Sequence, residues 1–337
     1  MIYPKFITKN DKIGVTAISD GITSKEKLYR LDNAIKNMEG LNFKVKETPN
    51  VRTSEFAKST SSKEQAHELI NLFKDKEVKT IILVVGGEFA ALTLPFIDFE
   101  TIKNNPKWIQ GYSDPTNILF TITTNLDIAT IYANNFAAFG MNPWHKSLTD
   151  NLEILKGNII KQESFKKYEG SHQKYLTGTE PYKLTRLVKW QNLFNEDNIT
   201  IKGRIIGGCI DCINDLFGTR FDNTLNFIEK YKNDGIIWYF DNCELSNEQL
   251  IRTLHKFKDT GWFKYCKGII FGRCYNKTSW NNISFEDALT YILKDLKVPV
   301  IINADLGHIS PRMTIINGSI AKVTSSKGKG SITFNLE

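Results

Sequence analysis

The sequence predicts an α/β fold: an N-terminal, mostly parallel sheet flanked by helices, followed by a smaller C-terminal α/β domain rich in β-strand. In the first half, short apolar runs alternate with segments of helical periodicity, which is typical of a parallel sheet covered on both faces. A second α/β pattern follows a polar stretch, and its last third is mainly strand-like. We therefore expect an N-terminal domain at 1–165, a linker or substrate loop at 166–200 and a C-terminal domain at 201–337.

The elements of the first half follow from their apolar patterns. Runs of β-branched and other apolar residues predict strands, and apolar residues at helical spacing predict the helices between them. The predicted strands lie at 12–18, 43–50, 80–87 and 108–113, and the predicted helices at 24–41, 61–78 and 117–126. In such a sheet, ligands bind at the carboxyl ends of the strands, where the stretches GGE (86–88) and GYSDPT (111–116) both fall.

The second unit begins at Ile201 with IKGRIIGGCIDCINDLFGT. It continues with an apolar strand that ends at Asp241 and a helix pattern in SNEQLIRTLHKF (246–257). Further strand-like runs are KGIIFGRCY, VPVIINADLGHISP and AKVTSSKGKGSITF.

Composition and charge exclude several classes of protein. Of 337 residues, 41% are hydrophobic and 24% charged, as in soluble globular proteins. The formal charge of +7 is scattered, so it indicates solubility, with a mild bias toward anionic small substrates and no nucleic-acid binding. No apolar core of a secretory signal and no run of about 18 apolar residues is present. We expect a cytoplasmic protein with no membrane span.

The five cysteines, an odd number in a long chain, indicate reduced thiols rather than a disulfide framework. Cys209 and Cys212 form a lone C-x-x-C motif. Without a second pair or clustered histidines, we interpret them as buried apolar thiols and expect no metal and no cofactor.

Ser113 lies where a predicted strand ends, just before Pro115, which suits the first turn of a helix. A serine held there is exposed, and the amides of the helix N-terminus can stabilise an oxyanion. The pattern is G-x-S-x-P, not the G-x-S-x-G of α/β-hydrolases. Alternatively, Ser113 or Asp114 is only a helix N-cap.

A serine nucleophile needs a base, usually a histidine. His308 lies in a loop after an apolar strand, where functional groups concentrate. His145, in a loop after MNPW, is a second candidate. The patterns place His67 and His255 on helix surfaces and His172 in the polar linker.

The base in turn needs an acceptor, and Asp241 stands at the end of the apolar strand IIWYFD, with Glu244 three residues later. Either acid could instead cap the following helix. Gly86 and Gly87 could supply oxyanion-hole amides or could form a tight turn, and both interpretations can hold together.

Taken together, VVGGEFA, GYSDPT, GRIIGGCIDCINDLFGT, WYFDNCE and ADLGHISP occur in the order found in the LD-carboxypeptidase family of serine peptidases, which the chain resembles over nearly its whole length. The length and the GGE variant look more like the microcin C immunity protein branch than the murein-recycling enzymes. The resemblance implies a Ser-Glu-His triad at a domain junction in a cytoplasmic hydrolase that usually forms dimers, without metal or cofactor.

Carried over by motif, the resemblance implies Ser113 as nucleophile and His308 as general base. The N–H groups of Gly87 and Asp114 would form the oxyanion hole. Asp241 occupies the position of the family's glutamate and is one methylene shorter, so it reaches the histidine only if the backbone or the ring lies closer. The further candidates for substrate binding are Gly86, Glu88, Trp190 and Glu244.

The predicted function is a serine hydrolase of the microcin C immunity type, which cleaves an amide in an aminoacyl-nucleotide or a related small peptide. Two alternatives are a murein LD-carboxypeptidase that releases terminal D-alanine from tetrapeptides and a weakly active or inactive ligand-binding relative. The loop 165–195 carries Tyr168, Tyr175, Tyr182 and Trp190. An aromatic residue there could stack on a base, or Trp190 could anchor the loop to the core.

Overall fold

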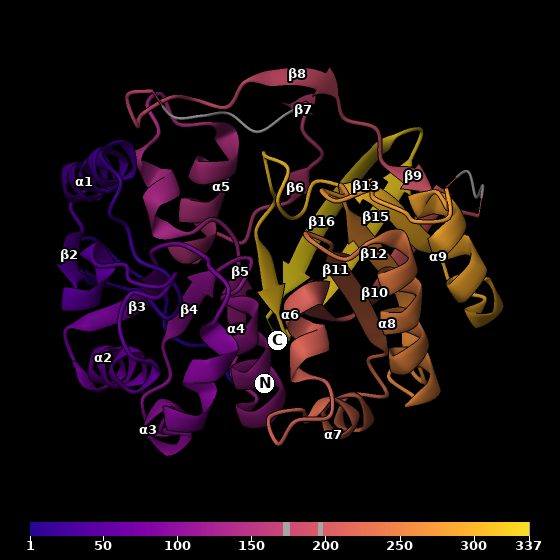
Figure 1. The fold of residues 1–337 in the computed structure, drawn as a ribbon, viewed down its shortest axis with the longest axis horizontal. Coiled ribbons are helices and arrows are strands. Elements are labelled where there is room, and N and C mark those ends of the chain that lie inside the picture. Colours follow the sequence, from indigo (N-terminus) through magenta and orange to yellow (C-terminus); the bar gives the residue numbers. More distant parts are fainter. Residues whose placement is uncertain (171–175, 195–197, 337) are drawn as a thin grey trace.

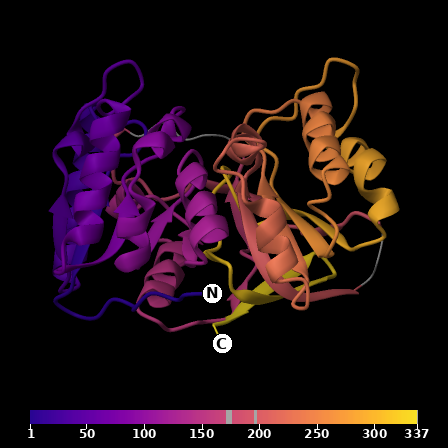
Figure 2. The ribbon, with the colours of Figure 1, turned by 90° about the horizontal axis from the view of Figure 1, so that it is seen from below.

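The computed structural model describes residues 1–170, 176–194 and 198–336, which form two large sheets with their helices (Figure 1, Figure 2) and a small sheet of β7 and β8. The first sheet has the strand order β14-β5-β4-β3-β1-β2 and is parallel except for β14, which runs antiparallel to β5. The second has the order β6-β16-β15-β10-β11-β12-β13-β9, with β10 to β13 parallel. The predicted fold class is confirmed.

Every strand and helix predicted in the first half is present, with shifted ends. The elements are β1 (Lys12–Thr16), α1 (Lys25–Gly40), β2 (Lys44–Glu47), η1 (Pro49–Arg52), α2 (Ser62–Lys74), β3 (Val78–Leu83), η2 (Ala90–Phe96), α3 (Phe99–Asn104), β4 (Trp108–Gly111), α4 (Thr116–Leu126), β5 (Thr130–Tyr132), η3 (Phe136–Gly140) and α5 (Lys146–Leu155). The largest difference is at β3, which ends before the two glycines, so Gly86 and Gly87 belong to the loop after the strand.

Most of the remaining elements build the second sheet and its cover, whereas β14 belongs to the first sheet and β7 and β8 pair with each other. They are β6 (Gln162–Glu163), β7 (Lys167–Glu169), β8 (Leu184–Leu187), β9 (Gln191–Asn192), β10 (Asn198–Cys209), α6 (Ile210–Leu216), α7 (Thr224–Lys230), β11 (Ile236–Asp241), α8 (Asn247–Asp259), β12 (Cys266–Gly272), α9 (Phe285–Leu293), η4 (Lys294–Leu296), β13 (Val300–Ala304), β14 (Ile315–Asn317), β15 (Ile320–Ser326) and β16 (Lys329–Asn335). Helix α8 begins at a full capping box formed by Ser246 and Gln249.

The two units exchange strands. β6 pairs with β16 in the second sheet, and β14 returns to pair with β5 in the first. The segment between β13 and β14 therefore crosses from one sheet to the other, and it carries His308 to the junction. The domain boundaries at 165 and 200 stay predictions, and the polar stretch between them contains β7, β8 and β9.

Two sequence predictions concern membrane passage and the thiols. None of the helices in the described part of the chain is both long and apolar enough to span a bilayer. All five cysteines are free thiols, and Cys209, Cys212 and Cys274 are buried, in agreement with the predicted reduced state.

Candidate active site

Ser113 stands on a strained turn between β4 and α4. Its φ of 71° lies in the left-handed region, which costs a residue with a side chain about 1–2 kcal/mol. The turn is fixed on both sides, because the Tyr112 N–H donates to Asn135 Oδ1 at 3.0 Å and the Thr116 N–H to the Ser113 carbonyl at 2.8 Å. No side chain caps the start of α4, so the N-cap alternative for Ser113 is wrong.

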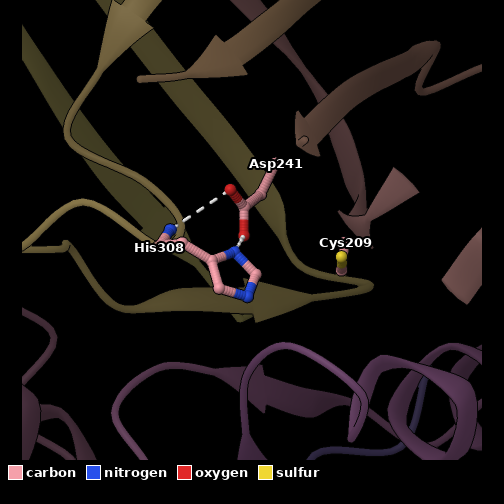
Figure 3. Close-up of side chains that lie close together, drawn as sticks. All are labelled: Cys209, Asp241 and His308. Atoms are coloured by element: carbon pink, nitrogen blue, oxygen red, sulfur yellow. Dashed lines mark hydrogen bonds and ion pairs between the residues drawn. The ribbon is translucent and has the colours of Figure 1, made fainter. Parts of the chain in front are cut away.

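His308 links the serine to an acid. Its Nε2 lies 2.8 Å from Ser113 Oγ, and its Nδ1 lies 2.6 Å from Oδ2 of Asp241. An ionised carboxylate only accepts hydrogen bonds, so Nδ1 carries the proton and Nε2 of the neutral ring faces the serine hydroxyl as an acceptor. Figure 3 shows the ring of His308 and the carboxylate of Asp241 turned toward one another.

Asp241 is the last residue of β11 and is fully buried. Its Oδ1 accepts the His308 backbone N–H at 3.2 Å, and its Oδ2 accepts the Tyr132 hydroxyl at 2.9 Å. Burial alone would raise the pKa of Asp241, but the neighbouring His308 and these hydrogen bonds hold it below its ordinary value. The carboxylate is therefore kept ionised next to the ring.

The shorter aspartate reaches the histidine because the loop before His308 packs directly on it. Gly307 has a φ of 83°, and a Cβ placed there would lie 1.9 Å from Asp241 Oδ1. Only a glycine at this position lets the backbone approach the carboxylate so closely. The aspartate thus reaches the ring with the Gly307 backbone packed against its carboxylate.

This packing predicts a large loss of stability in the Gly307→Ala variant. Alanine meets both the left-handed backbone penalty and the clash with Asp241, so we expect a loss of about 3–5 kcal/mol in the free energy of unfolding. The matched control is Gly218→Ala, where φ is 73° and no atom lies within 4 Å of the added Cβ. Urea unfolding of both variants measures the difference; equal losses would contradict the packing argument.

The glycine loop after β3 lies against the serine hydroxyl. A Cβ on Gly86 would lie 3.2 Å from Ser113 Oγ and 3.8 Å from the Asp114 nitrogen. Within the described residues, the N–H groups of Gly87 and Asp114 have no hydrogen-bond partner. The Asp114 carboxylate accepts the Ala90 N–H at 2.8 Å, which ties the glycine loop to the serine turn.

The other predicted site residues lie apart from this chain of hydrogen bonds. Glu88 and Glu244 are exposed residues. The partial burial of the Glu88 carboxyl, together with repulsion from Glu244, raises the pKa of Glu88. Trp190 is only 2% exposed, and its Nε1 donates to Asp305 Oδ2 at 2.9 Å. Trp190 therefore anchors its segment to the core and is not free to stack on a base. His145 caps α5 and bonds Ser147.

Two residues of the polar stretch, His172 and Tyr175, lie outside the described residues.

Cys209 lies near Asp241 and His308 (Figure 3). All three are residue types that can bind a metal, and one potential ligand atom of each lies within 4.8 Å of those of the other two. Its Sγ donates to Asp211 Oδ2 at 3.1 Å, and contact with Cys212 and burial raise the pKa of Cys209 well above its ordinary value. A metal would have to displace these bonds and those of Asp241, so the donor set fits a protonated thiol better than a ligand.

Two residues that touch this site, Tyr132 and Arg312, were not predicted from the sequence. Tyr132, at the end of β5, gave no signal because it lies in a short apolar strand. Arg312 contacts Tyr112, its guanidinium lying 3.8 Å from the ring centre. Its position four residues after His308 was a signal that could have drawn attention to it.

Comparisons with known proteins relate the chain to one family over most of its length. The family model of the LD-carboxypeptidase N-terminal domain matches residues 13–133, and that of the C-terminal domain matches 202–323. The Bacillus subtilis protein YocD is 27% identical over 98% of this chain and 98% of its own. The microcin C7 self-immunity protein MccF of Escherichia coli is 23% identical over 87% of this chain and 84% of its own.

Solved structures share the fold. An MccF-like protein from Bacillus anthracis has a TM-score of 0.83 and 26% identity, covering 99% of both chains. MccF in complex with aspartyl sulfamoyl adenosine has a TM-score of 0.80 and 22% identity, covering 99% of this chain and 98% of that one. The predicted resemblance, with its MccF-like branch, is confirmed. Since the two family models together match well over half of its residues, the chain belongs to the LD-carboxypeptidase family.

Proposed function

We propose that the protein is a serine hydrolase that cleaves an amide bond, with Ser113 as nucleophile, His308 as general base and Asp241 as the acid that orients the base. The observation that carries the proposal is the continuous chain of hydrogen bonds from Ser113 Oγ through His308 to Asp241, at 2.8 Å and 2.6 Å. The three side chains follow one another in the order nucleophile, base and acid, as in a catalytic triad. Membership of a peptidase family supports the same reaction class.

In the proposed acylation step, Ser113 Oγ attacks the amide carbonyl while Nε2 of His308 takes the hydroxyl proton. The carbonyl oxygen becomes an oxyanion, which the N–H groups of Gly87 and Asp114 would stabilise. His308 then gives the proton to the leaving nitrogen, and the C–N bond breaks. Asp241 stabilises the imidazolium that exists between these two transfers.

Deacylation repeats the same sequence with water. His308 takes a proton from a water molecule, the hydroxide attacks the acyl ester, and the proton returns to Ser113 Oγ as the C–O bond breaks. The products are a carboxylic acid and an amine, and the side chains regain their starting protonation. The short distance from Asp241 to His308 supports a hydrolase over the inactive ligand-binding alternative.

For the substrate, we propose an aminoacyl-nucleotide or a related peptide amide, as in the microcin immunity branch. Support comes from the likeness to MccF, which has been solved with aspartyl sulfamoyl adenosine. The second candidate is a murein tetrapeptide that loses its terminal D-alanine, and the description of the family as LD-carboxypeptidases favours it. The buried state of Trp190 leaves that side chain out of base recognition.

The experiment that separates these substrates is direct turnover. The purified protein is incubated with an aminoacyl-nucleotide phosphoramidate and, separately, with a murein tetrapeptide, and mass spectrometry follows the release of nucleotide or D-alanine. Release of nucleotide is the expected result. Turnover of the tetrapeptide alone would replace the proposed substrate by the second candidate, and turnover of neither would favour a ligand-binding protein.

We also propose that the protein is a cytoplasmic homodimer, as the family resemblance implies. Light scattering after gel filtration should give about twice the 38.5 kDa of one chain. A mass of 38.5 kDa at micromolar concentration would contradict the dimer.

Tyr132 acts as a positioning residue in this proposal, because its hydroxyl binds the carboxylate that orients His308. Loss of a hydrogen bond to a charged group costs about 1.5–3 kcal/mol, so Tyr132→Phe should lower kcat about 10-fold to 100-fold with little change in KM. The lowest-pH part of the activity profile, where Asp241 takes up a proton, should move to higher pH, because the hydrogen bond from Tyr132 lowers the pKa of Asp241.

The matched control is Tyr239→Phe, which removes a buried hydroxyl that binds Asn317 and not Asp241. It should lower stability without moving the pH profile. If both variants shift the profile alike, Tyr132 has no special role in holding the acid.

A further inference from the structure

A cavity of about 250 Å³ opens beside the proposed triad. His308 and Gly86 line one part of it, and three cations, Lys27, Arg30 and Arg312, line others. In the proposed reaction, Nε2 of His308 must reach the leaving nitrogen. A cavity lined by that residue is therefore placed to receive the leaving half of the substrate.

Arg30, which is 3% exposed, donates through Nη1 to the carbonyls of Gly178 and Glu180. Arg312 is the second buried cation of this cavity, with an exposed fraction of 4%. Its Nε donates to the Gly307 carbonyl at 2.7 Å, its Nη1 to Asn134 Oδ1 at 2.6 Å and its Nη2 to Ser310 Oγ at 3.4 Å. The guanidinium also lies over the Tyr112 ring. A guanidinium carries five N–H groups, so these three hydrogen bonds leave two N–H groups for a further acceptor.

The three hydrogen-bond acceptors of Arg312 are all neutral. Among the described residues, no carboxylate lies within ion-pair distance of its guanidinium, although buried charges in proteins are normally paired. The two acids of the cavity lining accept backbone N–H groups instead, Glu169 from Lys183 and Glu180 from Gly178. The exposed Lys27 likewise forms no ion pair within the described part of the chain.

We propose that Arg312 binds an anionic group on the leaving half of the substrate, with Lys27 adding to the positive charge at the cavity. This rests on the proposed function for the identity of the leaving half. The shared chemistry is an oxyanion that takes the two remaining N–H groups of the guanidinium. Two sources would supply it: the phosphate of a nucleotide or the terminal carboxylate of a peptide.

The test measures binding of leaving-half compounds by calorimetry, so it does not depend on turnover. AMP and D-alanine carry the anionic group, and adenosine and D-alaninamide are their neutralised counterparts. We expect at least one anionic compound to bind the full-length protein about 10-fold or more tightly than its counterpart. Tighter binding of AMP identifies the phosphate as the source, and tighter binding of D-alanine identifies the carboxylate.

Two variants assign the effect to residues. Arg312→Gln should bring the affinity for the anionic compound down to that for its counterpart, whereas Lys27→Gln should lower it about 2-fold to 5-fold. The matched control is Arg220→Gln, an exposed arginine that lies over Phe221 and does not line the cavity. Should Arg312→Gln fail to fold, the comparison of anionic and neutral compounds on the wild-type protein still tests the anion site, and so does the variant of the exposed Lys27.

Equal affinities for the charged and neutral compounds, or no binding of either anion at 10 mM, would overturn the proposal, as would an unchanged preference in Arg312→Gln. The outcomes also separate it from the proposed function. Binding that depends on Arg312 without any turnover leaves the anion site standing and removes the hydrolase. If a peptide and its C-terminal amide are instead hydrolysed at equal rates, without nucleotide release, the hydrolase stands and the anion site is contradicted.

Discussion

The Ser113→Ala variant is expected to lower kcat by about 10⁴-fold or more and to leave substrate affinity nearly unchanged. The reason is that Oγ is the only atom removed, and it is the atom that His308 Nε2 contacts at 2.8 Å. Alanine keeps the Cβ, so the strained turn at a φ of 71° costs the same in both proteins. Steady-state kinetics together with binding of substrate to the variant measure the two quantities separately.

A second variant at the same position tests the strain. Ser113→Gly should be as inactive as Ser113→Ala, yet more stable than it by about 1 kcal/mol, because glycine adopts a positive φ without a Cβ penalty. Urea unfolding gives the difference. Activity of Ser113→Ala within 10-fold of the wild type would show that Ser113 is not the nucleophile.

The pairing of His308 with Ser113 can be checked against another histidine. His308→Ala should abolish turnover, whereas His145→Ala should lower only stability, since His145 caps α5 and bonds Ser147.

Much of this site could be predicted because it is built at strand ends. In a parallel sheet the carboxyl ends of the strands lie at one edge, so the end of β4 and the loop after β3 could be expected to meet in the first sheet, and the end of β11 and the loop after β13 to share an edge of the second. That these two edges meet at one site was implied by the family resemblance alone. Ser113, Asp241 and His308 each follow or end an apolar run that the sequence displays openly. Periodicity also predicted the helices, because each buries one face against a sheet.

Other features had no local signal. The pairing of β14 with β5 joins Ile315 to Tyr132, and it depends on the edge of the first sheet, not on the sequence of either strand. The Tyr132 hydroxyl could not be assigned to Asp241 without that arrangement. Trp190 could not be placed from its neighbours either, because its partner Asp305 is more than a hundred residues away.

The family resemblance implies a glutamate where this chain has Asp241, and this difference can be tested at the acid itself. Asp241→Asn is expected to lower kcat by about 10⁴-fold. An amide has one acceptor and one donor end, but both oxygens of Asp241 accept N–H or O–H groups. If the NH₂ group replaces Oδ1, it faces the His308 backbone N–H; if it replaces Oδ2, it faces Nδ1 and favours the wrong tautomer of the ring.

The Asp241→Glu variant introduces the glutamate that the resemblance implies and is still expected to have a lower kcat than the wild type. Its additional methylene must fit into a fully buried space in which the backbone of Gly307 already touches the carboxylate. Overpacking of this kind costs about 1–3 kcal/mol and would displace His308, so kcat should fall about 10-fold to 100-fold. Steady-state kinetics and urea unfolding of the two Asp241 variants measure both effects. If the glutamate variant is faster than the wild type, the His308 loop adapts freely to the longer acid. In that case the close approach of Gly307 is not what makes aspartate sufficient.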